Sequence, residues 1–458
     1  MKLKQIVAAT LLAAVAGTAC ATDVFRLEGY GAISRGMGGT ATAYNSGPTG
    51  MLTNPATLSL MDKGSELLLG IDVINTDISV RNQATGQSTD SHTHSKNNGP
   101  YFAPEAAYAR REGQWSFGLG AFAQGGLGTE YGNSSFLSQT DTKANSQLEN
   151  SSRLLVLDIP LAASYDVNEK LSVGGSLDLM WVGLNLNMLL GGSQVGSLAG
   201  AGRVDGSLVA TLAGLPGGLA GLDGAHLSFS KNQPVASGIS AWGVSERIGL
   251  VYKLKGDTTL GAAYTFKSQL SDLEGNATLT AINLTTGPIP VAGKITAHDF
   301  QMPAVLNFGV SHQLTQQLQL TADVSEVFWK SVMKDISVSF VAANGANLNI
   351  LLPQNYSNQT IVAAGAAYKS GNWTLRGGAR IASQALDHNL LLAVIPATPT
   401  KHISVGASYD LSKDNSLHFA YSHALKETMS NSSLPNTPVP LEVSHAQNNL
   451  VLAYTRKF

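Results

Sequence analysis

Apolar residues alternate with small or polar residues along several stretches of the chain. In HISVGASYDL (402–411) every odd position is apolar or aromatic, and every even position is small, polar or charged. A similar alternation runs through KLSVGGSLDLMW (170–181), TLGAAYTF (259–266) and TLRGGARI (374–381). A period of two places successive side chains on opposite faces of a strand. The pattern therefore predicts an all-β protein whose strands separate an apolar environment from a polar one.

Short and long connections alternate between these strands. The short ones are tight polar turns at 111–113, 168–170, 255–257, 315–317, 370–372 and 413–415. The long ones lie at 82–100, 129–150, 188–236, 271–299, 335–356, 387–398 and 431–440. Six short turns and seven long connections predict fourteen antiparallel strands, with both ends of the strand region on the short-turn side. This arrangement, ending on the aromatic Phe458, is typical of an outer-membrane β-barrel.

Composition supports a membrane barrel over a soluble β-protein. Charged residues make up 13% of the chain, about half the usual share of a soluble domain. No window after the N-terminal region offers the ~18 consecutive apolar residues of a spanning helix, so a closed barrel is the remaining way to cross a bilayer. A soluble sandwich or propeller is the alternative, but no repeat of fixed period is present. The net charge of −2 argues against a nucleic-acid partner.

The first residues are typical of an export signal. Lys2 and Lys4 precede an apolar run (6–16) that is too short to span a bilayer, and an A-x-A site follows at Ala19 to Ala21. We therefore predict a signal peptide over 1–21. Acylation of Cys20, as in a lipoprotein, is the alternative. Cleavage after Ala21 removes the only cysteine, which suits the bacterial envelope.

The residues after the signal form a segment (22–62) that the strand count leaves unused, and the barrel follows at 63–458. The segment is rich in glycine and small residues. A barrel of this size encloses more lumen than side chains fill, so we expect the segment to fold into the lumen as a hatch. Asn54 and Pro55 favour a turn within it. GMGGTA (36–41) is not a dinucleotide loop, because no βαβ unit surrounds it.

The sequence resembles the outer-membrane long-chain fatty-acid transporters, the FadL-like family, which includes aromatic-hydrocarbon uptake channels. The resemblance rests on SRGMGGTATAYNSGPTGMLTNPATLS (34–59), WSFGLGAFAQGGLGTEYGN (115–133), QMPAVLNFGV (301–310), NWTLRGGARIA (372–382) and the terminal Phe458. Asn54, Pro55 and Ala56 match the NPA motif of that family's hatch. The resemblance implies a fourteen-stranded barrel, a hatch in the lumen, and an inward kink of the third strand that opens the wall sideways.

The residues themselves give a reason for such a kink. After Gln124, Gly125 and Gly126 remove side chains from the strand, and glycine inside a strand marks a bulge or bend. We therefore group Gln124, Gly125 and Gly126 with the NPA residues as the hatch and gate. An ordinary glycine-rich strand end near the outer rim is the alternative.

The longest outer connection carries an apolar stripe with helical spacing. Its leucines are Leu208, Leu212, Leu215, Leu219 and Leu222, and Pro216 breaks the stripe. Exposed apolar surface on an outer loop is costly unless it binds something. The resemblance implies that this surface is a capture groove for apolar molecules. A loop helix packed on its neighbours is the alternative. Val24 and Phe25, at the start of the mature chain, join these leucines as predicted substrate-binding residues.

A fatty acid would also need a cation for its carboxylate. Lys334, which resembles a lumenal lysine of the fatty-acid transporters, and Arg376 are the candidates, with Arg380 as a further one. Their alternative role is to pair with lumenal acids such as Asp323 or Asp178. The fifth strand departs from the family pattern, since 183–187 has no basic residue. The sequence therefore supports a carboxylated substrate less well than an apolar one.

We therefore predict an outer-membrane channel for passive uptake of hydrophobic small molecules, fatty acids or related apolar compounds. Uptake of aromatic or alkane hydrocarbons is the alternative. A lipid-acting barrel enzyme would need a Ser/His pair that we cannot place, and a general porin has no use for a hatch. The expected partners are the ligand and outer-membrane lipid, around a monomer. No cofactor or metal is predicted, and His92 and His94 are interpreted as solvated loop residues.

Overall fold

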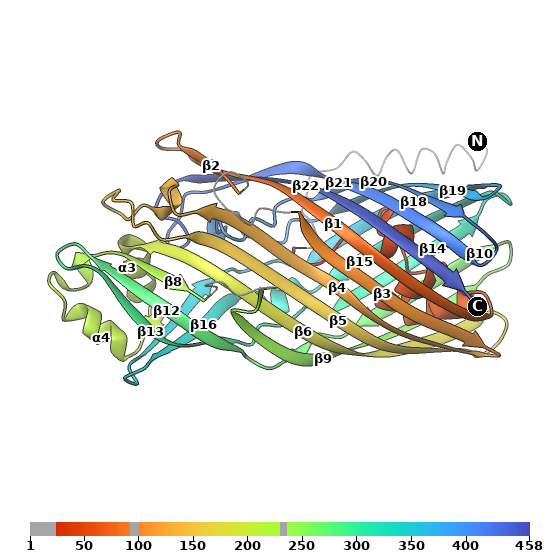
Figure 1. Ribbon diagram of the computed structural model, residues 1–458, viewed down its shortest axis with the longest axis horizontal. Coiled ribbons are helices and arrows are strands. Elements are labelled where there is room, and N and C mark those ends of the chain that lie inside the picture. Colours follow the sequence, from red (N-terminus) through yellow and green to blue (C-terminus); the bar gives the residue numbers. More distant parts are fainter. Residues whose placement is uncertain (1–23, 92–99, 230–235) are drawn as a thin grey trace.

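The computed structural model describes residues 24–91, 100–229 and 236–458, so the predicted signal peptide, His92 and His94 lie outside the described residues. Long tilted strands form an elongated barrel (Figure 1), and all described strands belong to one sheet of 22 strands. No helix in these described ranges is long and apolar enough to cross a membrane.

The wall consists of long antiparallel strands. They are β1 (Gly64–Asn82), β3 (Tyr101–Glu112), β4 (Trp115–Gly132), β5 (Asn150–Asp166), β6 (Leu171–Gly191), β8 (Leu222–Ser228), β9 (Ile239–Lys253), β10 (Thr258–Thr265), β12 (Leu273–Asn283), β14 (Val305–Gln313), β15 (Leu318–Val327), β18 (Gln359–Ser370), β19 (Trp373–Ala382), β20 (Lys401–Asp410), β21 (Asn415–Asn431) and β22 (Leu441–Lys457). Shorter or peripheral strands are β2 (Ser88–Asp90), β7 (Val204–Asp205), β11 (Gln269–Leu270), β13 (Gly287–His298), β16 (Asp335–Ala342) and β17 (Asn347–Pro353).

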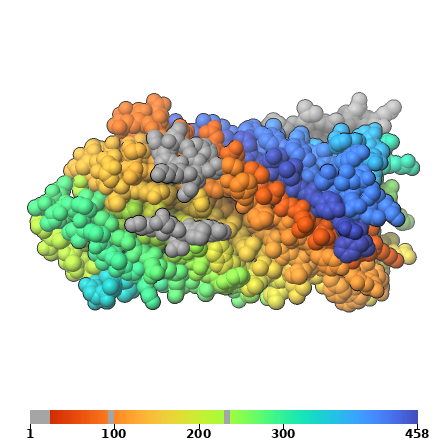
Figure 2. All heavy atoms as spheres, in the orientation of Figure 1, coloured from red at the N-terminus to blue at the C-terminus, as the bar shows by residue number. Residues whose placement is uncertain are grey.

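The wall closes on itself. The hydrogen-bonded circuit passes through sixteen strands, in the order β1, β3, β4, β5, β6, β8, β12, β9, β10, β14, β15, β18, β19, β20, β21 and β22. β22 then pairs with β1 from Lys457↔Glu66 to Leu441↔Asn82. Figure 2 shows this closure on the surface, where the blue C-terminal strands lie directly beside the orange β1.

The expectation of a fourteen-stranded barrel is wrong, because β8 and β12 lie in connections that we predicted to be loops (188–236 and 271–299). β6 pairs with β9 only as far as Leu184 and then continues to Gly191. β8 pairs with this extension, and β12 joins β8 to β9. A free strand edge leaves backbone N–H and C=O groups without partners, and the inserted strands satisfy them.

The six predicted short turns are confirmed, since each joins two consecutive long strands. The alternation of faces holds as well. On β20, Ile403 and Val405 are exposed, whereas His402 and Ser404 are buried inside the barrel. Aromatic pairs such as Trp373 with Tyr409 lie near the short-turn end, as expected for an interfacial girdle.

The N-terminal segment (24–62) folds as short helical turns, α2 (Gly31–Arg35), η1 (Gly47–Leu52) and η2 (Pro55–Leu60), and almost all of it is buried. These turns appear in red among the strands at the barrel end that carries the C-terminus (Figure 1). The Asn54 amide nitrogen donates to the carbonyl oxygen of Leu250 on β9, at 3.0 Å. The segment therefore packs against the inner face of the wall. Its role as a hatch stays a prediction.

Two short α-helices, α3 (Gly192–Gly200) and α4 (Ser207–Ala213), lie in the connection between β6 and β8, with the 3₁₀ turn η4 (Gly218–Gly221). In Figure 1 they cap the end of the barrel opposite the C-terminus. Further 3₁₀ turns in the described ranges are η3 (Phe136–Ser138), η6 (Trp329–Ser331) and η7 (His388–Leu390).

Candidate functional site

β3 and β4 separate part of the way along the barrel. Their ladder runs from Glu112↔Trp115 to Glu105↔Phe122. β3 continues along β1 as far as Tyr101, whereas β4 continues along β5, with a register shift between Ala123 and Gly125. A gap in the wall therefore opens between the two strands beyond Phe122.

The N-terminal segment takes the place of β3 beside the bent part of β4. The Gly126 N–H donates to the carbonyl oxygen of Phe25 at 2.8 Å, and the Leu27 N–H donates to that of Gln124 at 3.2 Å. The Gln124 amide donates to the Asp158 carboxylate on β5 at 3.0 Å. These bonds hold β4 inside the line of the wall, so that the gap persists.

Glycine is required for this close approach. A Cβ at Gly125 would lie 2.1 Å from the Phe25 carbonyl oxygen, and a Cβ at Gly126 would lie 2.9 Å from that of Leu154. Both distances are too short for a real side chain, so any larger residue would push the strand away. The glycines that we expected to bend this strand lie at its register shift.

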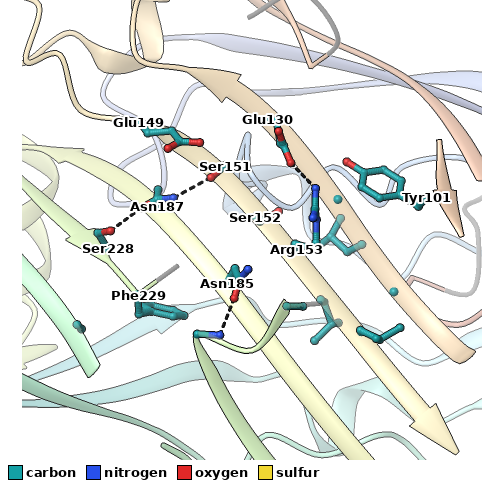
Figure 3. Close-up of a pocket in the computed structure, with 18 of the residues that line it drawn as sticks. Tyr101, Glu130, Glu149, Ser151, Ser152, Arg153, Asn185, Asn187, Ser228 and Phe229 are labelled. Atoms are coloured by element: carbon teal, nitrogen blue, oxygen red, sulfur yellow. Dashed lines mark hydrogen bonds and ion pairs between the residues drawn. The ribbon is translucent and has the colours of Figure 1, made fainter. Parts of the chain in front are cut away.

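A cavity of about 2040 Å³ runs through the gap. On the lumen side its lining includes Val24, Glu28 and Thr76, and at the gap it includes Tyr101 and Ala103. On the side away from the lumen, the cavity is lined by polar residues of β5, β6 and β8, namely Ser151, Arg153, Asn185, Asn187 and Ser228 (Figure 3). Asn185 and Asn187 share the face of β6 that elsewhere exposes Leu177 and Leu179. The cavity therefore connects the lumen with the outer face of the wall.

The mouth of this cavity is polar. The Asn187 amide donates to the Ser151 hydroxyl at 2.9 Å, and the Ser228 hydroxyl donates to the Asn187 amide oxygen at 2.6 Å. Arg153 and Glu130 form an ion pair at 2.5 Å. Figure 3 shows these side chains spread over adjacent strands around the mouth.

A packed apolar and aromatic cluster lies beside the lumen side of the cavity. Phe25 is buried and packs edge-to-face on Trp329, with 5.5 Å between the ring centroids, and Tyr356 lies 6.4 Å further on. Val24 is buried in the same cluster with a left-handed φ of 59°, which is unusual for a β-branched residue. Of the two N-terminal residues predicted to bind substrate, Val24 lines the cavity, whereas the Phe25 side chain is packed in the cluster beside it.

The leucines of the outer connection do not form one helix. α4 carries Leu208 and Leu212, Leu219 lies in η4, and Leu222 begins β8. Leu208 and Leu222 are buried in the main apolar cluster, and Leu212 packs against it. Leu215 is half-buried, as is Leu219. Part of the stripe is therefore core, and the half-buried part remains available at the surface.

The predicted cations lie away from the cavity. Lys334 is exposed, and its carbonyl oxygen accepts the N–H groups of Gln354 and Asn355 at 2.9 Å. Arg376 donates to the Ser408 hydroxyl at 2.6 Å on the neighbouring strand. Neither residue is among the described residues that line the cavity. Arg380, the further candidate, donates to the Glu28 carbonyl oxygen at 3.0 Å.

The predicted acidic partners have other contacts. Asp323 accepts the Ala41 N–H at 2.8 Å and the Thr42 hydroxyl at 2.7 Å, both from the N-terminal segment. Asp178 pairs with Arg247 at 2.8 Å. These acids therefore hold the N-terminal segment and another wall arginine, respectively.

The NPA turn contacts a different part of the wall. The Asn54 side chain accepts the Ala56 N–H at 3.1 Å and donates to the Thr42 carbonyl at 2.7 Å. Pro55 and Ala56 pack on Gly174 of β6, where a Cβ would lie 2.5 Å from the Ala56 nitrogen. The turn is seated on β6 and β9 rather than beside Gly125.

Sequence reasoning missed a buried ion network that anchors the N-terminal segment. Arg35 lies 2.8 Å from Glu28 and 2.7 Å from Asp72 of β1, and Glu105 of β3 accepts the Gly31 N–H at 3.1 Å. Burial raises the pKa of the Glu28 carboxyl, but Arg35 and other polar neighbours outweigh it and lower the pKa to about 2. Arg35 is the only charged residue over 29–61. A single charge in such an apolar segment could have indicated a buried ion pair.

In the described ranges, no cluster of three or more His, Cys, Asp or Glu side chains could hold a metal ion.

Comparisons with known proteins indicate a family of outer-membrane transport proteins. The family model described as outer membrane protein transport protein (OMPP1/FadL/TodX) matches residues 10–458. The solved toluene transporter TodX of Pseudomonas putida is 40% identical, with 94% of this chain and 99% of that chain covered and a TM-score of 0.83. The toluene transporter TbuX of Ralstonia pickettii is 44% identical, with 94% and 99% covered and a TM-score of 0.79.

Among curated proteins, outer membrane protein P1 of Haemophilus influenzae is 26% identical over 446 residues, which cover 92% of this chain and 90% of that protein. The first two curated matches are partial, and this chain spans 42% and 38% of their lengths.

Proposed function

Because this chain belongs to the OMPP1/FadL/TodX family of outer-membrane channels for hydrophobic compounds, we propose that it takes up single-ring aromatic hydrocarbons. Two similar solved proteins are described as toluene transporters, and each is covered over almost its whole length. Family members are transport channels, and we infer that this chain likewise acts as a single-chain channel without catalysis or cofactor.

One observation carries the proposed route: the cavity that connects the lumen with the outer face of the wall between β3 and β4. An apolar molecule would reach the lumen from the outer loops, where Leu212, Leu215 and Leu219 offer a first apolar contact. It would then pass Val24 and Phe25 and leave sideways into the bilayer. Apolar solutes partition into hydrocarbon, so no energy source is needed for this step.

The proposal also assigns the N-terminal segment (24–62) as the hatch. Its buried contacts with β1, β9 and β15 support a role in blocking polar solutes. A lateral exit needs no opening toward the periplasm. The hatch therefore stays seated while the apolar solute leaves through the wall.

The two cations that we predicted to bind a carboxylate do not serve the cavity. Lys334 is exposed and Arg376 is engaged with Ser408, and both lie outside the described lining of the cavity. Arg26, Arg153 and Lys294 do line it, and Arg153 is paired with Glu130. The choice of a neutral ring therefore rests on the two similar toluene transporters. Apolar lining residues such as Leu27, Leu127 and Leu154 offer such a ring apolar contact in the cavity.

The test is uptake of radiolabelled toluene and oleate by cells that depend on this channel. Gly125→Val combined with Gly126→Val should straighten β4 and abolish toluene uptake while the folded barrel still migrates faster on gels unboiled than boiled. Gly377→Val is the matched control, since a Cβ there meets only the Ser404 carbonyl at 4.0 Å. Normal uptake by the double variant would reject the lateral route. Faster uptake of oleate than of toluene by the parent would reject the aromatic substrate.

A further inference from the structure

Tyr101 occupies the entrance of the gap between β3 and β4. It is the first residue of β3 and pairs with Ile74 of β1, whereas the ladder with β4 starts at Glu105. It lies on the same face of β3 as the buried residues Ala103 and Glu105, and the intervening Phe102 is exposed. The Tyr101 side chain therefore points into the gap.

The ring lies directly against β4. A Cβ at Gly128 would be 2.4 Å from the ring carbon Cζ of Tyr101 and 2.5 Å from its hydroxyl oxygen. The absence of a side chain at Gly128 creates the seat for the ring. The Tyr101 side chain of β3 thus reaches across the gap to the backbone of β4 at Gly128.

Arg153 also contacts the ring, and Glu130 holds Arg153 in place. Arg153 pairs with Gly128 in the ladder between β4 and β5, so its side chain lies on the same face as the ring seat. Its guanidinium carbon is 5.3 Å from the centroid of the Tyr101 ring, within the range of a cation–π contact. Glu130 fixes the guanidinium by the ion pair (Figure 3).

From this geometry we infer that Tyr101 is the gate of the lateral passage and sets the size of solute that can leave. The inference rests on the proposed lateral route. The ring is held by its contacts with Arg153 and with the seat at Gly128, and these contacts are not part of a strand ladder. A rotation about its χ angles therefore clears the seat without breaking the ladders. A single aromatic ring can slip past or replace the tyrosine ring, whereas a larger fused-ring solute needs it fully displaced.

The test compares initial uptake rates of toluene and phenanthrene in cells that depend on the channel. Tyr101→Ala should raise the rate for phenanthrene relative to toluene by about fivefold, since the gate is gone. Tyr101→Phe should keep the parent ratio because the ring remains. Arg153→Met should raise the ratio to an intermediate value. Tyr108→Ala, which removes an exposed tyrosine from the outer face of β3, is the control and should leave the ratio unchanged.

A Tyr101→Ala variant with the parent ratio, or with slower uptake of both solutes, overturns the gate. Should that variant fail to fold, Gly128→Ala tests the same point, because the added Cβ expels the ring from its seat. The double valine variant at Gly125 and Gly126 separates the two claims. Toluene uptake that survives the double variant refutes the route itself, whereas blocked uptake with an unchanged Tyr101→Ala ratio refutes only the gate.

Discussion

Arg35 of the N-terminal segment lies 2.7 Å from Asp72 of β1, and both side chains are completely withdrawn from solvent. The pair joins the segment inside the barrel to the strand beside which the wall opens. Removing Asp72 leaves the buried Arg35 paired with Glu28, so the cost falls below the ~3–5 kcal/mol of an uncompensated buried charge.

We therefore expect Asp72→Ala to unseat the N-terminal segment without unfolding the barrel. The variant should admit small polar solutes in a liposome-swelling assay and still migrate as a folded barrel on unboiled gels. Arg110→Ala is the control. It breaks an exposed pair with Glu112, and such pairs contribute about 1 kcal/mol or less. A sealed Asp72→Ala barrel would mean that the ion pair does not hold the segment.

The NPA turn provides a second, independent anchor. Asn54→Ala removes the acceptor for the Ala56 N–H and the donor to the carbonyl oxygens of Thr42 and Leu250. Each buried group left without a partner costs about 1–3 kcal/mol. We expect increased single-channel conductance in planar bilayers, with uptake of toluene retained.

Asn45→Ala is the matched control for this anchor. Asn45 is exposed and accepts only a local N–H, that of Gly47. Equal conductance in the Asn54 and Asn45 variants would show that the turn does not seal the lumen.

The two predicted cations supply a third test, this time of substrate chemistry. Lys334→Ala should leave toluene uptake unchanged, because the side chain is exposed and outside the described cavity lining. Arg376→Ala should lower barrel stability by about 1.5–3 kcal/mol through loss of its hydrogen bond to Ser408, but should not change the preference for toluene over oleate. A selective loss of oleate uptake in either variant would restore the carboxylate hypothesis.

Local patterns in the sequence predicted the features that local chemistry determines. The polar turns, the alternation in 402–411 and the bend at Gly125 all depend on residues next to one another in the chain. β8 was missed because LDGAHLS (222–228) follows a leucine stripe with helical spacing and two of its residues are glycine or alanine. Its strand conformation is imposed by the free edge of β6, which a local pattern does not reveal.

The candidate site was only partly predictable for the same reason. Gly125 was visible as a bend, but its partner Phe25 lies about a hundred residues earlier, and no local pattern connects them. Arg35 stood out as the single charge in its segment, whereas the choice of Asp72 as partner depends on how the strands close. No pattern in the sequence pointed to Tyr101, because its proposed role depends on the separation of β3 from β4.

The pKa of Glu28 leads to a prediction about acid. Its value of about 2 in the folded protein lies below the ordinary glutamate pKa, and the favourable charges of Arg35 and His402 outweigh the opposing effect of burial. A depressed folded pKa means that ionised Glu28 stabilises the seated segment fully above the unfolded pKa of about 4.3. This contribution, about 3 kcal/mol, is lost as the pH falls from about 4.3 toward 2.

We expect the parent channel to stay sealed to small polar solutes at pH 7 and pH 5 and to become leaky in planar bilayers as the pH approaches 2. Glu28→Gln should leak at every pH, since the neutral amide removes the ion pair between Glu28 and Arg35, and should show little further change in acid. The strand ladder that closes the wall is unchanged in that variant, so the barrel itself should persist. If the parent and Glu28→Gln show the same leak at pH 7, the carboxylate does not hold the segment. If both stay sealed near pH 2, the charge of Glu28 makes no contribution to closing the lumen.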